Sequence, residues 1–234
     1  MIPRRIYLSV SLFLAFSVGL MLSTQAQDRS GPILIGDFES FPCSEFRYLA
    51  DQFMAELAKD PGSSGYVVNA GSFDKLASLV WREELIKAQM DVRNFDTSRV
   101  FFERAELDGA VRTQLWKMPS MVVRPKIENI NNSLSLSPHK KPFILIEQTF
   151  FNDSECPDVN YPKLFARFLD ANPQARANIV VYGQTSAEIW RREKTMITAM
   201  TSAFKIRRER IRTFRRRIRN DPGHPKGIEY WYLP

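Results

Sequence analysis

Residues 53–71 read FMAELAKDPGSSGYVVNAG and residues 165–183 read FARFLDANPQARANIVVYG, so one pattern occurs twice at an offset of 112. In each stretch a phenylalanine and a leucine stand four positions apart, an Asp-Pro or Asn-Pro pair follows, and an apolar run ends at a glycine. The first part has helical spacing and is stopped by proline, whereas the apolar run is typical of a buried strand. The pattern therefore predicts a helix followed by a strand, present in two copies.

Matches on both sides extend the repeat to a larger unit. Residues 33–35 and 144–146 both read ILI, and Arg99 and Arg210 are each followed by a β-branched residue. Arg82-Glu83 is likewise echoed by Arg192-Glu193, and both copies close on a tryptophan-containing run that ends in proline. Because these anchors keep their order at nearly constant offset, they indicate duplication of a unit of roughly 100 residues.

Each copy predicts the order strand, helix, strand, helix, strand, strand. In the first copy we expect strands at 33–35, 66–69, 99–105 and 111–118, with helices over 46–57 and 81–90. In the second copy we expect strands at 143–146 and 179–182 and two closing strands that end near residue 233, with helices over 161–171 and 189–204. The predicted fold class is α/β, an α+β sandwich of two tandem β-α-β-α-β-β units whose helices pack on a mixed sheet.

The first 26 residues have the features of a secretory signal peptide. Arg4 and Arg5 precede an uncharged apolar stretch from Ile6 to Leu22, and Thr24 and Ala26 occupy the two selective positions before cleavage. We expect cleavage after Ala26 and a periplasmic or secreted protein. An uncleaved N-terminal membrane anchor is the alternative, because this stretch is near the lower length limit for crossing a bilayer.

Beyond the signal peptide, residues 1–26, the chain divides into two predicted units and a connection. We place the first unit at 27–124, a linker at 125–142 and the second unit at 143–234. The linker is rich in Asn, Ser, Pro and Lys and lacks apolar periodicity, so we expect it to be exposed.

Charge differs between the two copies. Residues 27–124 contain 12 basic and 15 acidic side chains, a net charge of −3, whereas residues 125–234 contain 19 basic and 11 acidic, a net charge of +8. This divergence indicates that the two units do not meet the same partner.

The two cysteines lie at matching places, one in each copy. An even count in an exported chain favours a disulfide, so we predict a bridge between Cys43 and Cys156. It would close a loop of more than one hundred residues and contribute about 4 to 5 kcal/mol on the chain-entropy model. Two separate buried thiols are the alternative.

The motifs of the second copy resemble a known family. They are a helix ending in Asn-Pro at residues 165–173, a strand ending in glycine at 179–183, Arg191-Arg192-Glu193 on the next helix, and Arg210-Ile211 opening a strand. This order resembles the OmpA-like peptidoglycan-associated domain, and the first copy carries a weaker version of it. The resemblance covers most of both copies and implies that fold and a place in the cell envelope. Members of the family bind the diaminopimelate of peptidoglycan through an aspartate in a Thr-Asp pair after the glycine and an arginine on the following helix.

The ligand-binding residues of that family are matched only in part. Residues 183–185 read GQT and residues 71–73 read GSF, so the aspartate is missing from both copies. Arg82, Arg191 and Arg192 are the candidates for the ligand-binding arginine. The resemblance therefore supports the fold and the compartment more than the ligand.

Few residues could carry catalysis or bind a metal ion. His139 and His224 are the only histidines, and neither has Cys, Asp or Glu neighbours at metal-ligand spacing. The sequence lacks a Gly-rich phosphate loop, a Gly-x-Ser-x-Gly elbow and a His-Glu-x-x-His motif. We therefore expect no catalytic residues, no metal site and no cofactor, and a protein that is not an enzyme.

Residues 205–219 form the most basic segment, with nine Lys or Arg side chains opposed only by Glu209. This segment is either a solvated face or a contact surface for an anionic partner, since arginine binds phosphate and carboxylate groups through paired hydrogen bonds. The candidate ligand-binding arginines here are Arg207, Arg208, Arg212, Arg215, Arg216 and Arg219.

Together these features predict a non-catalytic, exported binding or scaffolding protein of the cell envelope. Its expected partners are peptidoglycan, anionic lipid or another anionic envelope polymer. The alternative is a protein–protein interaction module whose basic second unit docks an acidic partner protein. Nucleic acid is not an expected partner because the chain is exported.

Overall fold

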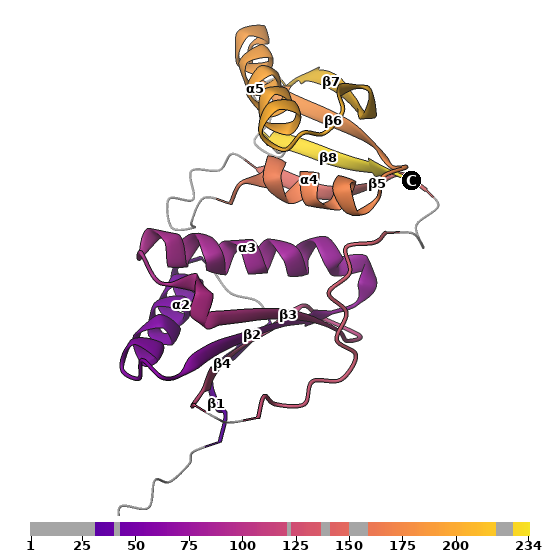
Figure 1. Cartoon of the computed structure of the whole chain (residues 1–234). Coiled ribbons are helices and arrows are strands. Elements are labelled where there is room, and N and C mark those ends of the chain that lie inside the picture. The colour runs from indigo at the N-terminus through magenta and orange to yellow at the C-terminus, as the bar shows by residue number, and fades with distance from the viewer. Residues whose placement is uncertain (1–30, 40–42, 121–122, 137–140, 150–158, 219–226) are drawn as a thin grey trace, which may run out of the picture. The chain divides into compact units, whose positions relative to one another are not determined.

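The structure is a computed structural model that describes residues 31–39, 43–120, 123–136, 141–149, 159–218 and 227–234 (Figure 1). Contacts place Pro32–Pro234 in one compact body, which contains both copies of the repeat. Among the described residues, no helix is long and apolar enough to cross a membrane. The predicted signal peptide, Cys156 and the side chain of Cys43 lie outside the described residues, so the cleavage and the disulfide remain predictions.

The first copy forms a four-stranded mixed sheet with two helices. Its main elements are β1 (Ile33–Phe38), α2 (Cys43–Ala58), β2 (Ser64–Gly71), α3 (Leu76–Val92), β3 (Val100–Glu106) and β4 (Arg112–Met118). The strand order is β1-β4-β2-β3, in which β2 and β3 are parallel and β4 runs antiparallel to both β1 and β2. Helices α2 and α3 contact each other and lie on the same side of the sheet (Figure 1).

The second copy repeats this arrangement. Its main elements are β5 (Phe143–Thr149), α4 (Tyr161–Ala171), β6 (Arg176–Gly183), α5 (Ser186–Thr198), β7 (Ile211–Arg217) and β8 (Gly227–Leu233). The strand order β5-β8-β6-β7 matches that of the first copy, with β6 and β7 parallel and β8 antiparallel to its two neighbours. The predicted fold class and the order of elements in each copy are therefore confirmed.

The repeated apolar anchors are the centres of the two cores. Phe53 and Leu57 on α2, and Phe165 and Leu169 on α4, are all 0% exposed. Because positions four apart lie on one face of a helix, each pair faces the sheet together. Burying two such side chains contributes about 3 to 6 kcal/mol, which explains why both copies retain them.

The glycine at the end of each central strand allows a close approach by the following helix. A Cβ atom on Gly183 would lie 2.7 Å from Cγ1 of Ile189, and one on Gly71 would lie 3.1 Å from Cδ2 of Leu79. Any side chain at Gly183 would collide with the first turn of α5, since real Cβ contacts are longer than 3.0 Å.

One arginine in the first copy, Arg99, joins three parts of the backbone. Its Nη2 donates to the carbonyl oxygens of Leu57 at 3.0 Å, Asp60 at 2.9 Å and Ser63 at 2.8 Å. These carbonyls belong to the end of α2 and to the turn that leads into β2. Since the last carbonyls of a helix have no partner within it, the guanidinium satisfies them and adds a favourable charge at the helix C-terminus.

Arg210 makes the same connection in the second copy. Its Nη2 donates to the carbonyl oxygens of Leu169 and Asn172 at 2.8 Å, and its Nε donates to that of Ala175 at 2.9 Å. We call Arg99 and Arg210 the clamp arginines. They explain why both copies carry an arginine directly before the parallel edge strand.

Part of the connection between the copies pairs with the first sheet. The backbone N–H of Asn131 donates to the carbonyl of Arg104 at 2.8 Å, and that of Glu106 donates to the carbonyl of Asn129 at 2.9 Å. Residues 129–131 thus run antiparallel along the outer edge of β3. These residues are exposed, as expected of the linker at 125–142, but the sequence did not predict that their backbone pairs with a sheet edge.

A second part of the connection belongs to the core of the second copy. Leu136 is only 1% exposed, and its N–H donates to Oδ1 of Asn172 at 2.8 Å. The Asn172 amide in turn donates to the carbonyl oxygens of Leu134 and Phe168. The asparagine of the repeated Asn-Pro pair therefore ties the connection to the end of α4.

Replacing a clamp arginine tests whether these contacts hold each unit together. We expect Arg99→Met or Arg210→Met to lower the free energy of unfolding by about 3 kcal/mol, because each leaves three partly buried carbonyls without their charged donor. The control is Arg93→Met, which removes an exposed arginine paired with Asp51 and should cost less than about 1 kcal/mol. Equal losses in urea titrations of the clamp and control variants would contradict a structural role for the clamp.

Candidate functional site

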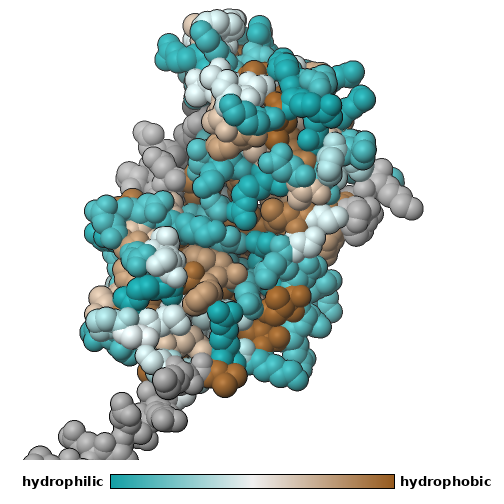
Figure 2. All heavy atoms as spheres, viewed as in Figure 1, coloured by the Kyte–Doolittle hydropathy of each residue, from teal (hydrophilic) through white to brown (hydrophobic). Residues whose placement is uncertain are grey.

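The basic segment forms an outer edge of the second sheet. The sheet order places β7 at the end of β5-β8-β6-β7, and a short 3-10 turn at Arg208–Arg210 leads into it. Ile211 at the start of β7 is buried, whereas Arg212 and Arg215–Arg217 are exposed. In Figure 2 the region of β7 is covered mainly by hydrophilic residues. The structure therefore gathers several predicted ligand-binding arginines on one strand.

Side chains on β7 alternate between the two faces of the sheet. Nε of Arg215 donates to Oε2 of Glu193 at 2.6 Å, and Oγ1 of Thr213 donates to Oε1 of the same carboxylate at 2.5 Å. Since Glu193 lies on α5, these two side chains point to the helix face. Arg212 and Arg216 alternate with them and therefore lie on the opposite face of the sheet from α5. We call this side of the second sheet the open face.

The open face of the second sheet combines these two arginines with aromatic groups. Phe214, between them on the same face, is 44% exposed. The adjacent strands place Tyr182 and Trp231 on this face, where the phenol O–H and the indole N–H both donate to Glu229 at 2.9 and 2.8 Å. Burial, together with the hydrogen bond to Glu229, raises the pKa of Tyr182 to about 12. The phenol therefore stays neutral and serves as a donor.

Other arginines of the basic segment have structural roles. Arg210 is a clamp arginine, and the guanidinium of Arg208 donates to the carbonyl of Ile211. Arg207 is paired loosely with Glu209 at 3.5 Å, and its side chain is 71% exposed. Arg219 lies outside the described residues. Of the arginines predicted there, the structure leaves Arg207, Arg208, Arg212, Arg215 and Arg216 exposed.

Arg82, the first-copy candidate for ligand binding, is part of the interior. Its Nη1 donates to Oγ1 of Thr113 at 3.0 Å, and its Nη2 donates to the carbonyl of Glu39. Thr113 is fully buried and donates in turn to Oδ1 of Asn69 at 2.7 Å. Burial lowers the pKa of Arg82 to about 10. The structure thus gives this half-buried arginine partners within the chain, and its role in ligand binding stays a prediction.

Arg191 and Arg192 line a cavity of about 250 Å³ in the second copy. The other lining residues come from β5, α4, α5 and β8, and they are Gln148, Pro162, Thr195, Met196, Ala199, Ile228 and Tyr230. Arg192 also donates to the carbonyl of Tyr182 at 2.8 Å and pairs with Glu188 at 2.7 Å. Arg191 is the more exposed of the two arginines. Most of the lining is apolar, and its described residues include no carboxylate that could take the place of the missing aspartate.

The loop after Gly183 is used to begin α5. Thr185 accepts a hydrogen bond from the N–H of Glu188 at 3.2 Å, and the Glu188 carboxylate accepts from the N–H of Gln184 at 2.7 Å. The first bond is the N-cap contact of a capping box, whereas the glutamate reaches one residue beyond the N-cap, to Gln184. The two residues at the place where the resemblance predicts a Thr-Asp pair therefore take part in beginning a helix.

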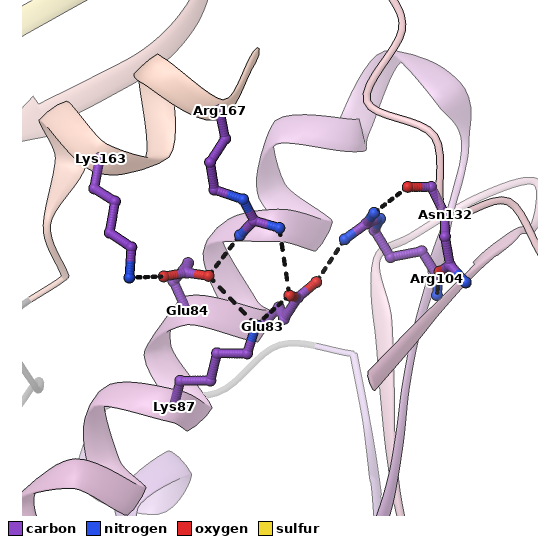
Figure 3. A network of polar contacts seen from close by, with 7 residues as sticks. All are labelled: Glu83, Glu84, Lys87, Arg104, Asn132, Lys163 and Arg167. Atoms are coloured by element: carbon purple, nitrogen blue, oxygen red, sulfur yellow. Dashed lines mark hydrogen bonds and ion pairs between the residues drawn. The ribbon is translucent and has the colours of Figure 1, made fainter. Parts of the chain in front are cut away.

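Sequence reasoning missed a network of charged residues around α3 (Figure 3). Its members are Glu83, Glu84, Lys87, Arg104, Asn132, Lys163 and Arg167. Glu83 lies within 2.5 Å of both Lys87 Nζ and Arg104 Nη1, and Arg167 on α4 pairs with Glu84 at 2.5 Å. The only signal in the sequence was the spacing of Glu83 and Lys87, four apart on one helix face.

The centre of this network is a buried ion pair. Burial alone would raise the pKa of Glu83, but the hydrogen bond from Lys87 and the charges of Lys87, Arg104 and Arg167 outweigh it and hold the pKa below its usual range. The side chains of Glu83 and Arg104 are 6% and 8% exposed. Because both carboxylates and the buried guanidinium of Arg104 have partners of opposite charge, the network reads as an internal connection rather than a binding site.

Comparison with known proteins gives little guidance. No family model matches the chain, and no curated protein matches it. Among solved structures, a cyanuric acid hydrolase is similar at a TM-score of 0.24 and 9% identity, over 86% of this chain and 66% of that one. A similarity this low supports no statement about fold or activity.

The charged network makes stability depend on pH in a way that one substitution can isolate. A carboxyl group with a lowered folded-state pKa contributes stability above its unfolded value of 4.5, and this contribution is lost as the pH falls through the folded-state pKa. We expect Glu83→Gln to cost about 3 kcal/mol at pH 7, because Arg104 would remain buried without its partner. The difference in free energy of unfolding between this variant and the wild type should shrink as the pH falls from 7 toward 3.

Chemical denaturation at both pH values measures this effect. The control is Glu56→Gln, because Glu56 pairs with an exposed lysine, Lys59. That change should have little effect at either pH. A Glu83→Gln penalty that is the same at pH 7 and pH 3 would show that packing, rather than charge, holds the network.

Proposed function

We propose that the protein is a non-catalytic, exported binding or scaffolding protein of the cell envelope, and that its second unit contacts an anionic envelope polymer. The observation that supports this proposal is the pair Arg212 and Arg216 on the open face of β7, with Phe214 exposed between them. Within the described part of the chain, neither arginine forms an ion pair, whereas Arg215 is held by Glu193. Two unpaired guanidinium groups beside an apolar ring suit a polymer that carries both anionic and apolar groups.

The first unit differs at the matching strand. Instead of four arginines, β3 carries Arg104 with Glu103 and Glu106, and Arg104 is buried against Glu83. The anionic contact is therefore assigned to the second unit alone, in line with the charge difference between the halves. The signal peptide and the resemblance to the OmpA-like domain support a place in the envelope. Peptidoglycan and an anionic lipid bilayer are the two envelope surfaces to be tested.

The test compares binding to anionic liposomes and to purified sacculi. We expect the exported chain to be retained on at least one surface, and Arg212→Ser with Arg216→Ser to abolish retention. Binding should weaken steeply with salt, because the screening length falls from about 10 Å at 0.1 M to about 3 Å at 1 M. Arg215 is left unchanged, since its removal would leave the Glu193 carboxylate without its partner.

A charge-matched control separates a local surface from net charge. Lys59→Ser with Lys126→Ser removes two exposed basic residues outside the basic segment and gives the same net charge as the double arginine variant. We expect this control to bind as the wild type does. Equal binding by the two double variants would overturn the proposal, as would retention that salt leaves unchanged.

A further inference from the structure

The two copies differ in what lies along the outer edge of their parallel edge strands. In the first copy, residues 129–131 occupy the edge of β3 through the two backbone hydrogen bonds to Arg104 and Glu106, with Ile130 opposite Ala105. Asn132 completes the contact, because its Oδ1 accepts from the N–H of Arg104 at 2.8 Å. This edge of the first sheet is therefore covered by an extended segment of the chain itself.

The register of the two sheets shows which positions of β7 correspond. Gly71 stands beside Glu106 in the first sheet, and Gly183 stands beside Arg217 in the second. The next residue donates its N–H back to that glycine in both copies, from Leu107 at 3.1 Å and from Ile218 at 3.0 Å. Arg217 thus corresponds to Glu106, and the strand positions before it correspond one by one.

This correspondence places the outward-facing backbone groups of β7. Along an edge strand, one residue turns its N–H and C=O groups toward the neighbouring strand, and the next residue turns them away from it. Ile218 faces β6, so Arg215 and Arg217 face outward, as their counterparts Arg104 and Glu106 do. Ile211 lies four residues before Arg215 and therefore faces the same way. Its carbonyl accepts a hydrogen bond from the guanidinium of Arg208, as expected of a group that faces outward.

Arg104 and Arg215 also share their side-chain environment. Arg104 Nη1 donates to Glu83 at 2.5 Å, and Arg215 Nε donates to Glu193 at 2.6 Å, so in each copy a glutamate on the second helix orients the guanidinium. In the first copy, Nη2 of Arg104 then donates to the carbonyl of Asn132. The second copy thus has the same donor positions, but Arg215 retains a 59% exposed side chain.

Within the described part of the chain, no backbone segment is hydrogen-bonded to the outward groups of Arg215 and Arg217. We propose that this edge of β7 binds an extended acidic segment of a partner protein, in the antiparallel direction that residues 129–131 take along β3. Such strand addition gains affinity from backbone hydrogen bonds and specificity from alternate side chains. It uses the strand edge and concerns a protein partner, so it goes beyond the polymer contact proposed for the open face.

The charges of β7 decide the kind of occupant. A second copy of β7 would bring arginines opposite arginines, and like charges directly opposite each other destabilise a strand pair. An acidic segment would instead place carboxylates opposite the arginines, and opposite charges stabilise a strand pair. Because Ile130 pairs with Ala105, its counterpart in the partner would lie opposite Arg216, and a residue four positions later would lie opposite Arg212. We therefore expect acidic side chains at these two positions of the bound segment.

A peptide derived from the covered edge provides the probe. It comprises residues 127–135 with blocked ends and with Ile130→Glu and Leu134→Glu, so that carboxylates stand opposite Arg216 and Arg212. We expect it to bind the full chain, with the largest changes in the ¹H–¹⁵N NMR spectrum at the amides of Arg215 and Arg217. The unchanged 127–135 peptide should bind at least about tenfold more weakly, since it lacks both added charges.

Two variants separate strand addition from attraction between charges. The same acidic peptide, N-methylated at the Asn131 position, keeps its charge but loses the N–H that would donate to the carbonyl of Arg215. We expect this peptide to bind about tenfold more weakly. On the protein side, Arg212→Ser with Arg216→Ser should weaken binding of the acidic peptide and leave its N-methyl dependence intact.

Equal binding by the N-methylated and unmethylated acidic peptides would overturn the proposal, and so would spectral changes confined to residues outside β7. Either result is compatible with retention on liposomes or sacculi, which does not involve the strand edge. Conversely, if the wild-type chain is retained on neither liposomes nor sacculi but still binds the acidic peptide, only the proposed function is contradicted.

Discussion

Both units depend on an arginine whose guanidinium holds the end of the first helix to the turn that follows it. In the second unit, Arg210 bonds the carbonyls of Leu169, Asn172 and Ala175 and directly precedes β7. It therefore fixes the start of the basic strand relative to the core. A lysine could not reach the same carbonyls with a planar fork of donors, which explains an arginine at both clamp positions. The strand that carries the candidate site is thus positioned by a neighbour that is not itself part of the site.

On this shared frame the copies have diverged at one strand. In each copy a glutamate on the second helix orients an arginine on the parallel edge strand. Glu83 orients Arg104 in the first copy, and Glu193 orients Arg215 in the second. In the first copy that arginine is buried and its strand edge is covered by residues 129–132, whereas in the second the edge carries exposed arginines. Duplication thus supplies an internal comparison, since one copy shows what the other edge is shaped to accept.

The sequence predicted the fold well because the strongest constraints are local and repeated. Phe165, Leu169, the Asn-Pro pair and Gly183 each mark a helix face, a helix end or a strand end, and all have the expected place. The candidate site was harder to predict, since the residue type does not say whether a guanidinium meets a ligand or a backbone carbonyl. Arg82 and Arg208 are examples, because both were predicted to bind a ligand and both donate hydrogen bonds within the chain, Arg82 to residues distant in sequence and Arg208 to the carbonyl of Ile211 three residues later.

The covered edge of β3 was missed for a related reason. The backbone groups of residues 129–131 make the contact, and backbone hydrogen bonds leave no periodic signal in the side chains. The linker was predicted from its composition and its lack of apolar periodicity, and neither feature shows where the backbone groups find partners. Only the register of the two sheets shows that this segment and the edge of β7 are related.

One parallel edge strand, β3, is covered, whereas its counterpart β7 has no segment of the described residues paired along its outer edge. Amide hydrogen exchange on the isolated chain tests this most directly, because Arg104 and Glu106 on β3 correspond to Arg215 and Arg217 on β7. The account predicts strong protection at the first pair of amides and rapid exchange at the second pair. Equal protection of all four amides would contradict it, because the edge of β7 would then already be occupied.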